Sequence, residues 1–136
     1  MKKYRITLTE AQTAIVQIAL EEYFRLRMGQ DMTFSDDMAG LGKDINPDNP
    51  KFDELFSSYI QRRDSLNEVM RAYFRIAYGP KGYLEKKTDN MEIAECIWDA
   101  IRFKRGQSRW PDVFCIGPEP VPMIEVIEDG KAKSVL

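Results

Sequence analysis

Apolar residues at helical spacing fill three long stretches of this chain, and they limit it to a mostly helical fold. The stretches cover residues 10–28, 50–78 and 89–105, and within each the apolar residues recur three and four positions apart. Local start and stop signals agree with these bounds: a Thr9-x-x-Gln12 capping box, Gly29 and Gly79-Pro80 as stops, and Thr88 or Asp89 as the last cap. The chain is predicted to have three helices, or four if the middle stretch breaks near Asp64-Ser65.

Two short segments near the chain ends follow a different pattern. Residues 4–8 and 121–128 alternate apolar and polar side chains and are rich in β-prone residues. They have few candidate partners except each other, so we expect them to pair as a small antiparallel ribbon. The predicted fold class is therefore α+β, mostly helical, with a polar loop at 30–48. The chain length suits a single domain, 1–136, with a frayed tail at 129–136.

The apolar side of two predicted helices is unusually wide. Only a narrow polar stripe interrupts the apolar residues at 14–26, and the helix from residue 66 to 78 repeats the pattern. A helix that is apolar over most of its circumference must be covered over most of it. Exposed apolar patches of this size usually have a partner, so we expect a homo-oligomer. The alternative is a compact helical core with both helices at its centre.

The residue inventory excludes several chemistries. The chain has no histidine, which removes the commonest general base and most transition-metal sites. Its two cysteines, Cys96 and Cys115, are too few for a disulfide framework and are most simply reduced and buried. A net charge of -2 argues against general nucleic-acid binding, and no apolar run approaches a membrane span. We expect a cytoplasmic, non-enzymatic protein with no cofactor and no metal.

One basic, aromatic segment stands out from the balanced charge of the rest. Between Ile101 and Trp110 there are four cationic side chains and no acidic one. Arginine binds phosphate or carboxylate bidentately, and an indole can stack on a planar ring. The predicted ligand-binding residues are Arg102, Arg105, Arg109 and Trp110, with Arg75 adding charge from another helix or subunit. The alternative is an ordinary helix end, because cations in a last turn complement the helix dipole.

Several short motifs carry a resemblance to a known group. They are Ile6-Thr7-Leu8-Thr9-Glu10-Ala11-Gln12, the helix end Tyr23-Phe24-Arg25-Leu26-Arg27-Met28-Gly29-Gln30, Ile97-Trp98-Asp99-x-x-Arg102, and the closing segment 117–127. In these the chain resembles small uncharacterised proteins of tailed bacteriophages. Many phage accessory proteins act on host defences, and several small ones are oligomeric sponges for nucleotide immune signals. The resemblance implies a role of that kind in the host cytoplasm, by analogy.

Two functions follow as expectations. The first is a non-enzymatic phage-type accessory protein, an oligomeric sponge that sequesters a small anionic, nucleotide-like immune signal. The second is a protein-interaction module that blocks a host defence factor through an apolar surface. A histidine-free enzyme that uses carboxylates and a metal has no support in the spacing of the acidic residues.

Overall fold

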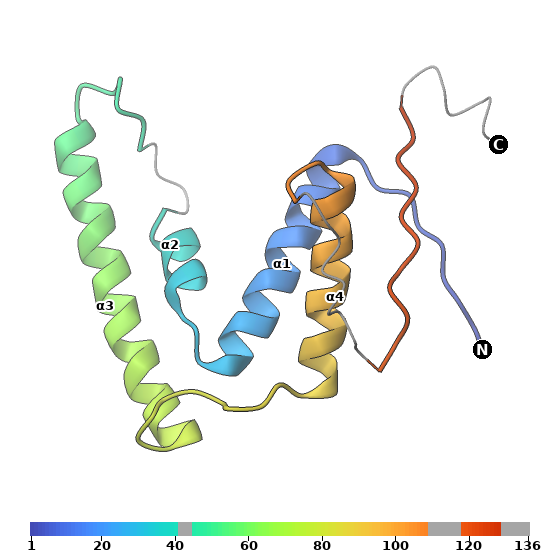
Figure 1. Ribbon diagram of the computed structural model, residues 1–136. Coiled ribbons are helices and arrows are strands. Elements are labelled where there is room, and N and C mark those ends of the chain that lie inside the picture. The colour runs from blue at the N-terminus through green and yellow to red at the C-terminus, as the bar shows by residue number, and fades with distance from the viewer. Residues whose placement is uncertain (41–44, 109–117, 129–136) are drawn as a thin grey trace. The chain divides into compact units, whose positions relative to one another are not determined.

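The computed structural model describes residues 1–40, 45–108 and 118–128, and within them every regular element is a helix (Figure 1). The four helices are α1 (Glu10–Met28), α2 (Met32–Gly40), α3 (Phe52–Tyr78) and α4 (Asp89–Lys104). The chain divides into two compact units whose boundary falls inside α1. The first unit comprises Met1–Glu21 and Thr88–Leu136, and the second comprises Glu22–Lys87. The single domain stays a prediction.

The predicted antiparallel ribbon is wrong, and with it the α+β class. Neither residues 4–8 nor residues 121–128 form a strand, so the described part of the chain is all-helical. Their alternating apolar side chains are open to solvent, as the 74% exposure of Ile6 and the full exposure of Met123 show. The β-propensity of these residues and the alternation of their apolar and polar side chains are local properties that do not supply a partner strand. An isolated two-stranded ribbon is also marginal in water. The tail predicted at 129–136 lies outside the described residues.

Local signals placed the starts of α1 and α4 correctly, whereas α3 begins at Phe52 and not at residue 50. At the start of α1 the Thr9 N–H donates to Gln12 Oε1 at 2.9 Å, and the Gln12 N–H donates to Thr9 Oγ1 at 3.1 Å. This reciprocal pair is the predicted capping box. Thr88 Oγ1 caps α4 by accepting from the Met91 N–H at 3.4 Å. Each of these bonds spans three residues, so the sequence motif alone contains the information.

The loop predicted at 30–48 is wrong in part, because it contains α2. This helix of nine residues is too short to be stable by itself and packs on α3. The Arg62 guanidinium on α3 donates to the Ala39 carbonyl oxygen from Nε at 2.9 Å and from Nη2 at 2.6 Å. That carbonyl belongs to the last turn of α2, where intrahelical donors are missing. A side chain distant in sequence therefore stabilises the helix.

A second contact joins the same two helices. The Tyr59 hydroxyl donates to Asp36 Oδ1 at 2.9 Å, and Arg63 Nε lies 3.8 Å from the same carboxylate oxygen. Desolvation raises the pKa of Tyr59, and the hydrogen bond to Asp36 raises it further. The hydroxyl thus stays a donor at neutral pH. The predicted break near Asp64-Ser65 is wrong, since α3 runs unbroken through 27 residues.

Each unit has its own small core. In the first unit the core lies along α4, where Met91, Ala94, Cys96, Trp98, Ala100 and Ile101 are buried. Cys96 is buried as predicted, but it is disulfide-bonded and not the reduced thiol that we expected; Cys115 lies outside the described residues. In the second unit the buried apolar residues are Phe24, Ala39 and Phe74.

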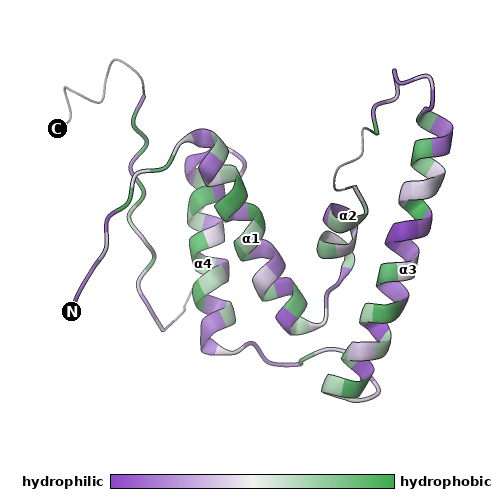
Figure 2. Cartoon of the chain, turned by 180° about the vertical axis from the view of Figure 1, so that it is seen from behind, coloured by the Kyte–Doolittle hydropathy of each residue, from purple (hydrophilic) through white to green (hydrophobic). Residues whose placement is uncertain are grey.

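The wide apolar arcs keep an exposed side. On α1, Ile15 is 67% exposed and Ile18 is 48% exposed. On α3, Val69, Tyr73 and Ile76 are exposed, the last to 85%. Hydrophobic residues, coloured green, recur along both helices in Figure 2. The homo-oligomer and its alternative, a compact helical core with both helices at its centre, both stay predictions.

The Arg62 contact gives the first testable expectation. Arg62→Ala removes both hydrogen bonds to Ala39 and leaves that carbonyl without its charged donor. Such bonds contribute roughly 1.5–3 kcal/mol, so the free energy of unfolding should fall by about that amount in a urea titration. Gln61→Ala, an exposed neighbour on the same helix, is the matched control and should change little. Equal stability of the two variants would show that Arg62 does not hold α2.

Candidate functional site

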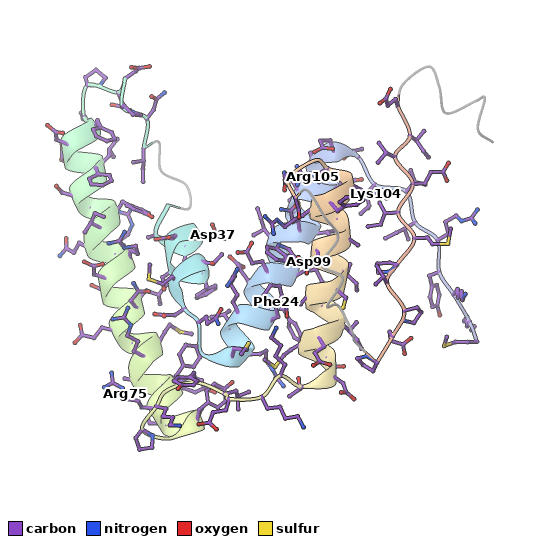
Figure 3. All side chains as sticks on the ribbon, in the orientation of Figure 1. Phe24, Asp37, Arg75, Asp99, Lys104 and Arg105 are labelled. Atoms are coloured by element: carbon purple, nitrogen blue, oxygen red, sulfur yellow. The ribbon has the colours of Figure 1, made fainter. Side chains whose placement is uncertain are left out.

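The cationic end of α4 makes its contacts within the first unit. Arg105 forms an ion pair with Glu10 at 2.7 Å and also donates to Gln17, and its side chain is only 18% exposed. Arg102 lies over the Trp98 ring, 4.3 Å from the ring centroid, and its Nη2 is 3.5 Å from the Gln107 carbonyl oxygen. The Arg105 contacts tie the end of α4 to α1 (Figure 3), whereas those of Arg102 stay within α4 and the turn that follows it. They fit the helix-end interpretation of these two residues.

The other predicted ligand residues are placed differently. Arg109 and Trp110 lie outside the described residues. Arg75 belongs to α3 in the second unit, near the end of that helix (Figure 3). Ligand binding at Arg102, Arg105, Arg109 and Trp110 thus stays a prediction. Arg75, in contrast, belongs to a cluster of cations that the structure assembles within one unit.

This cluster surrounds a hollow of about 390 Å³ in the second unit. Three cationic side chains line it: Arg71 and Arg75, one turn apart on α3, and Lys81 in the loop that follows. One carboxylate, that of Asp31, also lines it, so positive charge predominates. We call this the corner site, and its lining residues are Gly29, Asp31, Arg71, Phe74, Arg75, Pro80, Lys81, Gly82 and Tyr83. Its volume lies in the range of small-molecule pockets, roughly 300–1,000 Å³.

The corner site exists because two chain segments approach each other closely. Gly29, at φ +92°, ends α1, and a Cβ atom there would lie 2.4 Å from the Gly82 carbonyl oxygen. The Leu84 N–H donates to the Met28 carbonyl oxygen at 3.0 Å. The Tyr78 hydroxyl donates to the Arg27 carbonyl oxygen at 2.7 Å. The glycine lets the turn after α1 rest directly on the loop after α3, and this contact brings Asp31 to the cations.

The charges of the corner site are only loosely paired. Arg71 Nε is 3.8 Å from Asp31 Oδ2, beyond hydrogen-bond distance, and its side chain is 58% exposed. Lys81 pairs with Glu85 at the surface, where an ion pair contributes little. Arg75 folds back so that its Nε is 3.3 Å from the Arg71 carbonyl oxygen. All three cations can therefore turn to an incoming anion at small cost.

Sequence reasoning identified part of this site. Arg75 was predicted, but as a charge that another helix or subunit adds to the site at Arg102, Arg105, Arg109 and Trp110. Asp31, Lys81 and Gly82 were missed, because nothing local shows that residues 29–31 meet residues 80–83. The two glycines at 29 and 82, both with positive φ, are the signal that could have indicated a close backbone approach.

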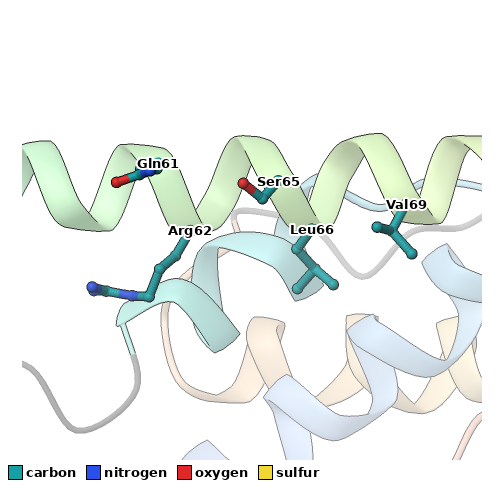
Figure 4. A pocket seen from close by; sticks show the side chains of 5 residues that line it. All are labelled: Gln61, Arg62, Ser65, Leu66 and Val69. Carbon is teal, nitrogen blue, oxygen red and sulfur yellow. The ribbon is translucent and has the colours of Figure 1, made fainter.

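A second hollow lies on the surface of α3. It is about 460 Å³ and is lined by Gln61, Arg62, Ser65, Leu66 and Val69. The side chains of Arg62, Leu66 and Val69 point to the same side of the helix (Figure 4). The hollow is open and mostly apolar, without convergent polar groups apart from Arg62. It suits contact with a protein surface better than recognition of a small polar ligand.

The described residues form neither a metal site nor a membrane-spanning helix. No group of three or more His, Cys, Asp or Glu residues there could hold a metal ion, and no helix there is long and apolar enough to cross a membrane. Comparison with known proteins also gives no match: no family model fits the chain, and no curated protein or solved structure is significantly similar to it.

The glycine contact provides a test of the corner site's architecture. Gly29→Ala should destabilise the second unit strongly, because the new methyl group meets backbone atoms that cannot move alone. Gly79→Ala is a matched control: φ is +90° there, but nothing lies within 4 Å of the added Cβ. The control should cost about 1–3 kcal/mol, because φ +90° with ψ −174° is a conformation that essentially only glycine adopts. Hydrogen exchange of the Leu84 amide should accelerate in Gly29→Ala only; equal effects of the two variants would contradict the close approach.

Proposed function

We propose that this protein is a non-enzymatic binder of a small anionic ligand of the nucleotide class. The observation that carries the proposal is the corner site, where Arg71, Arg75 and Lys81 converge on one hollow without strong partners. Guanidinium groups bind phosphate bidentately, and a lysine adds a point charge. The ring of Tyr83, 48% exposed at the rim, offers a face for stacking.

The proposal includes sequestration by an oligomer in the host cytoplasm. The support is the exposed apolar stripe of Val69, Tyr73 and Ile76 on α3, three residues at positions i, i+4 and i+7. Side chains at this spacing share one face of a helix. A second copy of the chain would cover them. The resemblance to phage proteins suggests an immune signal as the ligand, and a sponge needs binding without turnover, which suits a histidine-free chain.

The same stripe supports the alternative function. A host defence factor with an apolar surface could cover Val69, Tyr73 and Ile76 in place of a second copy. In that case the protein acts as an interaction module, and the open hollow beside Leu66 and Val69 would take part in the contact. The two functions differ in whether a small anion binds at all.

Nucleotide titration tests the proposed function. Nucleoside mono- and diphosphates should raise the melting temperature, since a ligand at a hundredfold excess over Kd stabilises by about 2.7 kcal/mol. Arg75→Gln should weaken binding about tenfold through the loss of a charged hydrogen bond. Arg63→Gln removes the same charge from the same helix outside the corner site and is the control. If only Arg109→Ala and Trp110→Ala weaken binding, the ligand is at the end of α4 instead.

Light scattering tests self-association. At micromolar concentration the mass should be at least twice the 15.8 kDa of one chain. Ile76→Glu should reduce it to that of a monomer without unfolding the protein, because Ile76 is exposed in the protomer and its charge is buried only in the oligomer. Ser57→Glu, an exposed position on the first turns of α3, should leave the mass unchanged. A parent protein that is monomeric would rule out the oligomeric part of the proposal.

A further inference from the structure

A buried carboxylate in a cation-lined hollow needs a physical reason. Asp31 is 6% exposed and lines the corner site, and its Oδ2 atom has no hydrogen-bond partner. Buried polar atoms in proteins nearly always have a partner, whether from the protein, from water or from a ligand. Arg71 offsets the charge from 3.8 Å, but it does not occupy the lone pairs of Oδ2. Oδ2 is thus a buried acceptor to which the described residues give no donor.

The second unit has two further buried polar atoms of this kind. Ser35 Oγ and Asn67 Oδ1 are also buried without a hydrogen-bond partner. Ser35 follows Asp31 by one helical turn, and Asn67 precedes Arg71 by one turn, so each lies on the same helix face as a residue of the corner site. Neither residue lines the hollow, and both are buried.

Helix capping does not account for Asp31. The residue stands directly before Met32, the first residue of α2, where an aspartate commonly accepts from a backbone N–H in the first turn. Oδ2 accepts no such bond. The Ser35 N–H donates to the backbone oxygen of Asp31 at 2.9 Å, which is the first intrahelical bond and forms with or without a side-chain cap. A site built only for an anion would also gain nothing from a carboxylate, which repels anions.

We infer that Asp31 accepts a hydrogen bond from the ligand that Arg71, Arg75 and Lys81 hold, so that the ligand is a phosphate-bearing nucleotide with an N–H or O–H donor directed at Asp31. This inference rests on the proposed function and specifies the chemistry of its ligand. The imino and amino groups of guanine, the amino group of adenine and the ribose hydroxyls are the donors that a nucleotide offers. The cations then bind the phosphate, and the carboxylate selects among anions by the donor they carry.

Calorimetric titration of the full chain with GMP, AMP and sulfate tests the inference, because sulfate carries no donor at neutral pH. Asp31→Asn keeps the side-chain shape and the capping ability and removes the charge. It should weaken nucleotide binding about tenfold, the effect of losing a hydrogen bond to a charged group. Sulfate binding should stay equal or strengthen, since a repulsive charge is gone. Asp37→Asn, an exposed aspartate on the same helix outside the hollow (Figure 3), should change neither.

The outcomes separate the inference from the function on which it rests. If Asp31→Asn strengthens binding of all three anions, the carboxylate only repels, and the inference fails while anion binding stands. If the parent protein binds neither nucleotides nor sulfate, the proposed function itself is wrong, and the inference about Asp31 falls with it. A preference for GMP over AMP places the donor on the base, and loss of affinity for a 2′,3′-dideoxynucleotide places it on the ribose. Should Asp31→Asn lower the melting temperature, Asp31→Ser gives the same comparison with another capping residue.

Discussion

The second unit depends on the contact between the backbone at Gly29 and the backbone at Gly82. A side chain at residue 29 would meet the Gly82 carbonyl oxygen at 2.4 Å, so only glycine allows the end of α1 to rest on the loop after α3. This contact decides where α2 begins, because Asp31 and Met32 follow within three residues. It also determines which charges share a hollow. The corner site is thus a consequence of a backbone approach, and its cations contribute little to holding it together.

The arginines of this chain differ in how much they already contribute to the stability of the fold. Arg105 is mostly buried and pairs with both Glu10 and Gln17, and withdrawing it would cost the contact between α4 and α1. Arg71 is more than half exposed and 3.8 Å from its partner, where an ion pair contributes between roughly 0 and 1 kcal/mol. A phosphate could displace the Arg71 ion pair at little cost. Displacing the Arg105 contacts would lower the stability of the fold. This difference in cost is why the corner site is the stronger ligand candidate.

The sequence predicted whatever depends on neighbours within a few residues. The capping box at Thr9, the cap at Thr88 and the stops at Gly29 and Gly79 are local, and they appear as expected. The ribbon and α2 depend on partners far along the chain. The alternating end segments formed no ladder, whereas α2 gained the donor of Arg62. The candidate site shows the same contrast. Arg75 could be predicted from its residue type, whereas the burial of Asp31 depends on the tertiary structure.

The two surfaces of α3 make ligand binding and self-association compatible. Consecutive residues of a helix are turned by about 100° from one another. Arg71 and Arg75 face the corner site, while Val69, Tyr73 and Ile76 form the exposed stripe. A second copy on the stripe would therefore leave the hollow of each protomer open to solvent. Every residue that lines the corner site also comes from one unit of one chain. Self-association would then increase the number of sites per assembly, but no site would depend on it. Each protomer should bind one ligand whether it is free or assembled.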